Sequence, residues 1–157
     1  MSRAASKGTT IGFTDYSRGQ YGPREGLKRC LDMLDTHDIK STFFVPGIVA
    51  EKYTAQVESI HARGHEIACH GYMHESVRGI SAEEETEILE KSEAILKRNH
   101  GRRPVGHEGS WRASSIHLPL SCLAQRGYLY SSSMKDCDWA YLWGKGRAGP
   151  SAGGAAV

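Results

Sequence analysis

Long apolar runs are missing from this sequence, which narrows the classes of protein it can encode. No stretch approaches the roughly 20 apolar residues of a membrane-spanning helix, so we expect no membrane partner. The first residues, Met1–Lys7, include basic side chains, but no apolar segment follows them as it would in a secretory signal. We therefore expect a cytoplasmic protein.

Paired cysteines and concentrated positive charge are also missing. The cysteines at positions 30, 69, 122 and 137 form no C-x-x-C pair, so reduced thiols are expected rather than a disulfide framework. The formal net charge is +2 and the basic residues form no stripe, which argues against nucleic acid as a partner.

The residues that are present describe a globular domain followed by a tail. The chain has 157 residues, of which 39% are hydrophobic and 24% charged, enough for one core. Residues 144–157 are rich in glycine and alanine and lack the large apolar residues that a core needs. We predict one domain over residues 1–143 and a disordered tail over residues 144–157.

Helical and strand patterns alternate along the chain, which favours an α/β fold with parallel strands and crossover helices. Ser81 and Glu84 form a capping box that opens a long helix, closed near Gly101. A loop is expected over residues 17–23. The expected strands are residues 9–14, 39–45, 65–70, 103–106 and 127–130. The expected helices are residues 24–37, a segment from Val49 that ends before Gly64, residues 81–101 and residues 115–126.

Two histidines, His70 and His74, follow the predicted strand 65–70 and lie four residues apart. Neutral imidazole is the commonest protein ligand for zinc-like metals. The spacing alone is a weak signal, because the chain has 8 histidines. Its position strengthens the signal, because ligand sites in parallel α/β folds lie at the carboxyl ends of strands. Other strand ends, at Pro46–Gly47 and Gly106–Glu108, are expected to meet there, which predicts a metal site.

Several segments in the same order resemble a known family. They are Ile39–Gly47, Gly64–Ile67, His70–Glu75, Arg103–Gly106, Ser110–Trp111 and Gly127–Met134. Together they resemble the polysaccharide deacetylases with a NodB homology domain, carbohydrate esterase family 4, over residues 17–143. The segment Ser17–Gly22 resembles the branch with peptidoglycan deacetylase-like and allantoinase-like members. The resemblance implies a distorted (β/α) barrel, of which this chain carries an incomplete part, as a truncated or frame-shifted form would.

The resemblance also implies a metal-dependent hydrolase of non-peptide carbon–nitrogen bonds. In this family one Asp and two His hold a divalent metal, usually zinc, an Asp acts as base and a later His as acid. His70 and His74 match the two histidine ligands. Phe13–Asp15 can be aligned with the family's Phe-Asp-Asp, which makes Asp15 the metal ligand and puts Thr14 at the position of the base. Alternatively, Asp15 belongs to the following loop and the family's first strand lies upstream.

The match is imperfect in the third motif and beyond it. Glu108 stands where the resemblance implies an Arg, the neighbouring Pro is missing, and no Leu-x-x-His motif follows residue 143. Gly106, Glu108 and Trp111 are candidate substrate-binding residues, although Trp111 could equally pack in the core. An open part of a barrel would also expose sheet edges, so we expect low stability or a homo-oligomer.

Three functions therefore remain open. The first is deacetylation of a glycan that contains N-acetylglucosamine. The second is an allantoinase-like opening of a cyclic amide, with a small amide as substrate. The third is a catalytically inactive remnant, or pseudoenzyme, that binds carbohydrate.

Overall fold

The computed structural model describes residues 19–75, 80–109 and 120–133. The predicted strand 9–14 and the tail 144–157 lie outside these residues. The elements in chain order are η2 (Gly22–Gly26), α2 (Leu27–Thr36), β1 (Thr42–Val45), α3 (Gly47–Lys52), α4 (Thr54–Ala62), β2 (Glu66–Cys69), α5 (Ala82–His100), β3 (Gly106–His107), α6 (Leu120–Gln125) and β4 (Tyr130–Ser131).

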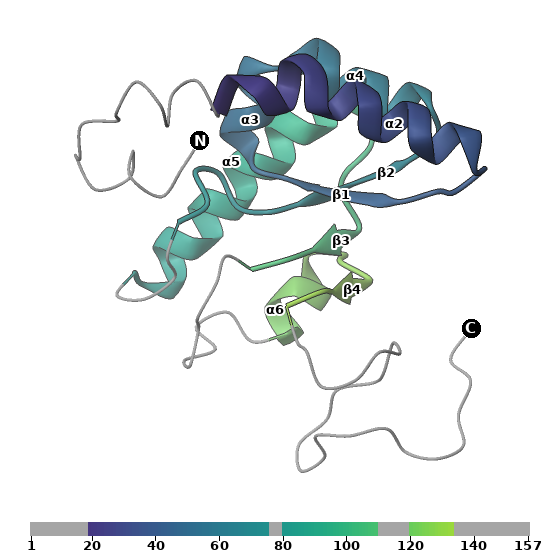
Figure 1. Ribbon diagram of the computed structural model, residues 1–157. Coiled ribbons are helices and arrows are strands. Elements are labelled where there is room, and N and C mark those ends of the chain that lie inside the picture. Colours follow the sequence, from purple (N-terminus) through teal and green to yellow (C-terminus); the bar gives the residue numbers. More distant parts are fainter. Residues whose placement is uncertain (1–18, 76–79, 110–119, 134–157) are drawn as a thin grey trace, which may run out of the picture.

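The four strands form one parallel sheet in the order β1-β2-β3-β4. Thr42 pairs with Glu66 and Val45 with Cys69, so β1 and β2 are in register along their whole length. Helices α2, α3 and α4 lie together above β1 and β2 in Figure 1, whereas β3, β4 and α6 occupy the lower part of the view. The predicted α/β class with a parallel sheet is confirmed.

Successive side chains along a strand point to opposite faces of the sheet, so alternate residues face the covering helices. Val45, Ile67 and Cys69 join a buried core with side chains from the helices. Thr42 and Glu66 point to the opposite face, where the Tyr130 hydroxyl donates a 2.7 Å hydrogen bond to Glu66. The helical members of the core are Leu31, Ala50, Val57, Ile60, Leu89, Ile95, Leu96 and Leu123.

Helix α5 begins and ends as the sequence predicts. The backbone N–H of Glu84 donates to the Ser81 hydroxyl, and the Glu84 carboxylate accepts from the backbone N–H of Ser81, which completes the capping box. Gly101 ends the helix in the left-handed conformation, with φ of 78°. Within the described part of the chain, no helix is both long enough and apolar enough to cross a membrane.

Four local predictions were wrong. The chain is already helical from Gly19, through η2 into α2, where a loop was expected. Pro23 stands in the first turn of η2, where its missing N–H costs no hydrogen bond, so proline here does not mark a loop. The helix expected from Val49 is two helices, broken at Tyr53, whose φ is −129°. The strand expected over residues 103–106 pairs only at Gly106 and His107, and the strand expected over residues 127–130 is β4, at Tyr130 and Ser131.

Candidate active site at the carboxyl edge of the sheet

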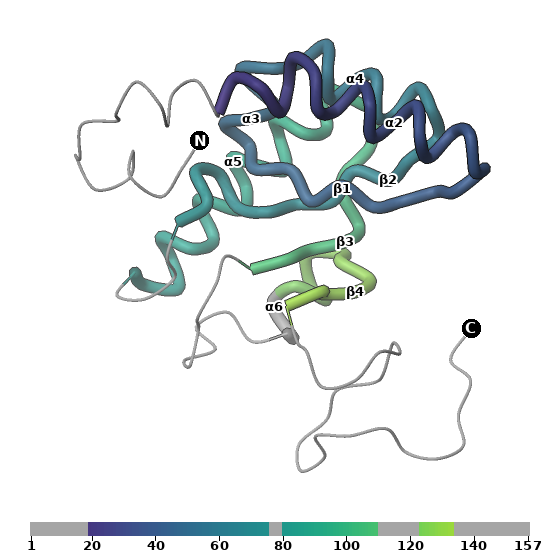
Figure 2. Tube along the Cα trace, viewed as in Figure 1, coloured from purple at the N-terminus to yellow at the C-terminus, as the bar shows by residue number. Residues whose placement is uncertain are grey.

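The loop after β2 lies between the segments that follow β1 and β3. Its carbonyls at Gly71 and Tyr72 accept 2.9 Å hydrogen bonds from the backbone N–H groups of Gly47 and Ile48. On the other side, the N–H of Glu108 donates to the Cys69 carbonyl at 3.0 Å. Figure 2 shows that the chain leaves β2 and β3 at the same end of the strands, on the left of the view. The predicted meeting of strand ends is therefore present.

The two predicted histidine ligands lie next to each other in this loop. The ring centroids of His70 and His74 are 4.6 Å apart and the ring planes meet at 67°. The His70 side chain is 13% exposed, and His74 is an exposed residue. The four-residue spacing thus brings two imidazoles together through a bend at Tyr72 and Met73 rather than through a helical turn.

One hydrogen bond determines which ring nitrogen of His70 is available to bind a metal. Its Nδ1 atom lies 2.9 Å from the backbone carbonyl of Glu108. A carbonyl oxygen only accepts, so in the neutral imidazole the Nδ1 atom carries the proton and the Nε2 atom keeps its lone pair. This is the usual arrangement behind a histidine that binds a metal, because the second hydrogen bond orients the ring.

Residues with left-handed backbone stand on both sides of this bend. Gly71 has φ of +67° and His74 has φ of 62°. Glycine accepts such a φ without strain, whereas histidine does so only at some cost. The carboxylate of Glu75 accepts hydrogen bonds from the backbone N–H groups of Tyr72 at 3.1 Å and Met73 at 2.8 Å. These two bonds hold the loop in its turned form.

Glu108 contributes to this edge mainly through its backbone. Its carboxylate Oε2 lies 3.7 Å from His70 Nδ1, beyond hydrogen-bond distance. Nδ1 is thus the ring nitrogen that the Glu108 carboxylate approaches. The N–H of Gly109, the next residue, donates to the Ser133 hydroxyl at 2.8 Å, which ties the segment after β3 to the residues after β4.

A buried polar layer, formed by Cys69, His107 and Glu93, lies behind the histidines, and the sequence pattern indicated the burial of Cys69 alone. Cys69 is fully buried, and burial raises the pKa of its thiol. Burial also lowers the pKa of His107 to about 4, so this imidazole is neutral at physiological pH. Glu93 of α5 is only 6% exposed and accepts hydrogen bonds from Arg103 and Arg126. The spacing of Glu93 between Leu89 and Leu96 on one helix face could have revealed its burial.

The remaining predicted site residues are placed as follows. Gly106 is buried under the ring of Tyr130, against which an added Cβ would collide. Asp15 and Trp111 lie outside the described residues, so their predicted roles stay predictions. Among the residues that the structure describes, no group of three or more His, Cys, Asp or Glu is arranged to hold a metal ion. The two imidazoles fit part of a zinc-type ligand set, which then needs a further donor.

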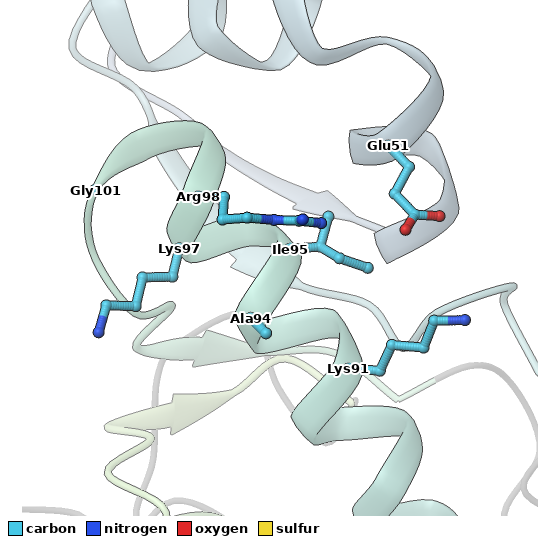
Figure 3. Close-up of a pocket in the computed structure, with 7 residues that line it drawn as sticks. All are labelled: Glu51, Lys91, Ala94, Ile95, Lys97, Arg98 and Gly101. Atoms are coloured by element: carbon cyan, nitrogen blue, oxygen red, sulfur yellow. The ribbon is translucent and has the colours of Figure 1, made fainter.

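A groove on the outer helical layer lies beside this edge. Figure 3 shows its lining side chains, with Glu51 from α3 on one side and Lys91, Ile95 and Arg98 from α5 on the other. Its volume is about 710 Å³. The groove runs along α5 and contains neither histidine of the pair, so the sheet edge remains the better candidate for chemistry.

The polysaccharide deacetylase family model matches residues 19–113, more than half of the chain. The chain belongs to the polysaccharide deacetylase family. A peptidoglycan deacetylase of Helicobacter pylori is 30% identical over 125 residues, which cover 80% of this chain and 42% of the relative. The chain therefore spans about two fifths of the length of that relative.

Solved structures agree with the family assignment. A crystal structure described as a polysaccharide deacetylase from Mycobacterium smegmatis has a TM-score of 0.71 and 37% identity, covering 76% of this chain and 41% of that one. The crystal structure of the allantoinase Puue has a TM-score of 0.72 and 27% identity, covering 81% and 41%. The predicted fold, a partial (β/α) barrel of the NodB deacetylase type, is thus confirmed.

Proposed function

We propose that this polysaccharide deacetylase family member hydrolyses the acetamide bond of a glycan that contains N-acetylglucosamine, with a divalent metal, zinc, as cofactor. The observation that carries the proposal is the His70–His74 pair, whose ring centroids are 4.6 Å apart at the carboxyl edge of the sheet. The name of the Helicobacter pylori relative, peptidoglycan deacetylase, supports a glycan as substrate.

In this proposal His70 and His74 are metal ligands and Asp15 is the third. When bound, the metal polarises the amide carbonyl and lowers the pKa of a water molecule. The Glu108 carbonyl keeps the proton of His70 on Nδ1, so that Nε2 is available. Glu108, Gly106 and Trp111 belong to the substrate side of the site, with Trp111 as a wall for a sugar ring.

Acetate release and metal binding test the proposal. The purified chain is incubated with zinc, or with cobalt, and oligomers of N-acetylglucosamine, and released acetate is measured. His70→Ala and His74→Ala are each expected to weaken zinc binding and acetate release at least about a hundredfold, because each removes one ligand. His37→Ala is the matched control, because His37 is exposed and follows α2 at the opposite end of the sheet from the pair.

The possible results separate the parts of the proposal. No stoichiometric binding of zinc, cobalt or nickel contradicts the metal centre. Metal binding without acetate release from glycan contradicts the deacetylase activity but leaves the metal centre standing.

An allantoinase-like activity is the second candidate, because the similarity to the allantoinase Puue covers 81% of the chain with a TM-score of 0.72. Opening of the allantoin ring, measured in the same metal-loaded protein, would favour it over deacetylation. A third candidate is a carbohydrate-binding pseudoenzyme. It is favoured by Glu108, which puts a carboxylate where the family resemblance implies an Arg. Glycan binding that His70→Ala alters, in a chain with no turnover of either substrate, would support it.

A further inference from the structure

The Glu75 side chain ties together the segment that separates the two histidines. Its Oε2 accepts from the N–H of Tyr72 and its Oε1 from the N–H of Met73, at 3.1 and 2.8 Å. Consecutive N–H groups that converge on one anion form a small nest, whose shape persists while both bonds are present. The segment from His70 to His74 is thereby closed by a contact within the loop itself.

Gly71 leaves little freedom for any other arrangement. Its φ is +67°, and an added Cβ would lie 3.0 Å from Glu75 Oε2. A side chain at position 71 would therefore press on the carboxylate as well as strain the backbone. Gly71 and Glu75 thus form one unit, in which the missing side chain of the first makes room for the second.

The Tyr72 side chain anchors the same segment to the helices. Its hydroxyl donates to the Glu51 carboxylate at 2.8 Å, and Lys91 Nζ lies 3.4 Å from the centre of its ring. Glu51 and Lys91 come from α3 and α5, on the two sides of the groove in Figure 3. This anchor fixes where the loop lies, whereas the Glu75 contacts fix how it turns.

The two histidines differ in what fixes their position. His70 directly follows β2, and its ring is bonded to the Glu108 carbonyl. His74 is exposed and has a left-handed backbone with φ of 62°, so its ring position follows from the loop conformation. A change in the loop therefore moves His74 relative to His70, and both are needed to hold one ion.

We propose that Glu75 is a positioning residue for the histidine pair: its bonds to the Tyr72 and Met73 amides set the distance between the rings of His70 and His74 and thereby the metal affinity. This inference rests on the proposed metal-dependent function. Loss of a group that orients metal ligands lowers metal affinity about 10- to 100-fold. Glu75→Ala is expected to lower zinc and cobalt affinity within that range.

Three variants test the role in the full chain by calorimetric titration with zinc and with cobalt. Glu75→Ala removes both acceptors. Glu75→Gln keeps one acceptor oxygen, so its affinity is expected between those of the wild type and Glu75→Ala. Glu84→Ala is the matched control, because Glu84 also accepts from a backbone N–H, but in the capping box of α5. It loses helix stability and is expected to keep the wild-type metal affinity.

Amide hydrogen exchange in the metal-free protein gives a readout that does not depend on metal or substrate. Faster exchange of the Tyr72 and Met73 amides is expected in Glu75→Ala and not in Glu84→Ala. Unchanged exchange at these amides, or a Glu75→Gln affinity within twofold of wild type, would overturn the inference and leave the metal proposal intact. Wild-type protein that binds no metal would overturn both.

Discussion

Replacing Glu93 by Gln tests whether the buried polar layer behind the histidines stabilises the fold. The carboxylate of Glu93 accepts from Arg103 Nη2 at 2.7 Å and from Arg126 Nη2 and Nε at 2.9 and 3.1 Å. Loss of one partner from a buried ion pair costs about 3–5 kcal/mol. Both guanidiniums keep access to water, with side chains 49% and 20% exposed, so we expect a smaller loss of about 2 kcal/mol.

The pKa of Glu93 also predicts the direction in which this loss of stability changes with pH. Burial alone would raise the pKa of Glu93, but the bonds and charges of Arg126 outweigh it and hold the pKa below its ordinary value of 4.5. A depressed folded-state pKa contributes stability that is present above pH 4.5 and is lost as the pH falls through the folded-state value. The difference in stability between wild type and Glu93→Gln should therefore shrink on acidification.

Urea unfolding followed by circular dichroism measures both effects, at pH 7 and at steps below pH 4.5. Glu90→Gln is the matched control, because Glu90 lies one turn away on α5 and also contacts Arg126, at 3.1 Å, but is 59% exposed. This exposed pair is expected to contribute about 0.5 kcal/mol or less. Equal losses in the two variants, or a difference from wild type that does not change with pH, would refute the reasoning.

Two further predictions concern the loop and the metal. Gly47→Ala places a Cβ 2.8 Å from Tyr72 Cδ2 and 3.3 Å from the Ser92 Cα. We therefore expect the free energy of unfolding in urea to fall by about 1–3 kcal/mol and zinc binding to weaken. A free energy of unfolding within about 0.5 kcal/mol of wild type would contradict the predicted crowding. Asp15→Asn is expected to lower zinc affinity at least about tenfold in calorimetric titration if Asp15 is the third ligand, and unchanged affinity would assign that role to another group.

The parts of the fold that were predictable are those in which local pattern and packing agree. Leu31 and Leu34, spaced along a helix, are both buried in α2, and the Ser81 capping box marks the start of α5 as predicted. The strand Thr42–Val45 was found for the same reason, because its apolar side chains suit a sheet covered by helices. Such signals are carried by neighbouring residues and need no knowledge of distant contacts.

The features that sequence did not reveal depend on contacts between distant residues. Gly106 is buried because Tyr130, from the next strand, lies across it. Glu93 is buried because Arg126, which is 33 residues away, neutralises it. At the candidate site the histidine pair was predictable from spacing and strand position, but the left-handed conformation of His74 and the Glu75 contacts were not.

The proposed metal centre needs a third donor besides the two histidines. Two carboxylates lie near the histidine pair, and each has another role. Glu75 is bonded to two backbone amides, and Glu108 lies on the Nδ1 side of His70, where the ring carries its proton. Within residues 19–75, 80–109 and 120–133 no three His, Cys, Asp or Glu side chains are arranged to hold a metal ion, so a set of three protein ligands needs a further donor, which is the role proposed for Asp15.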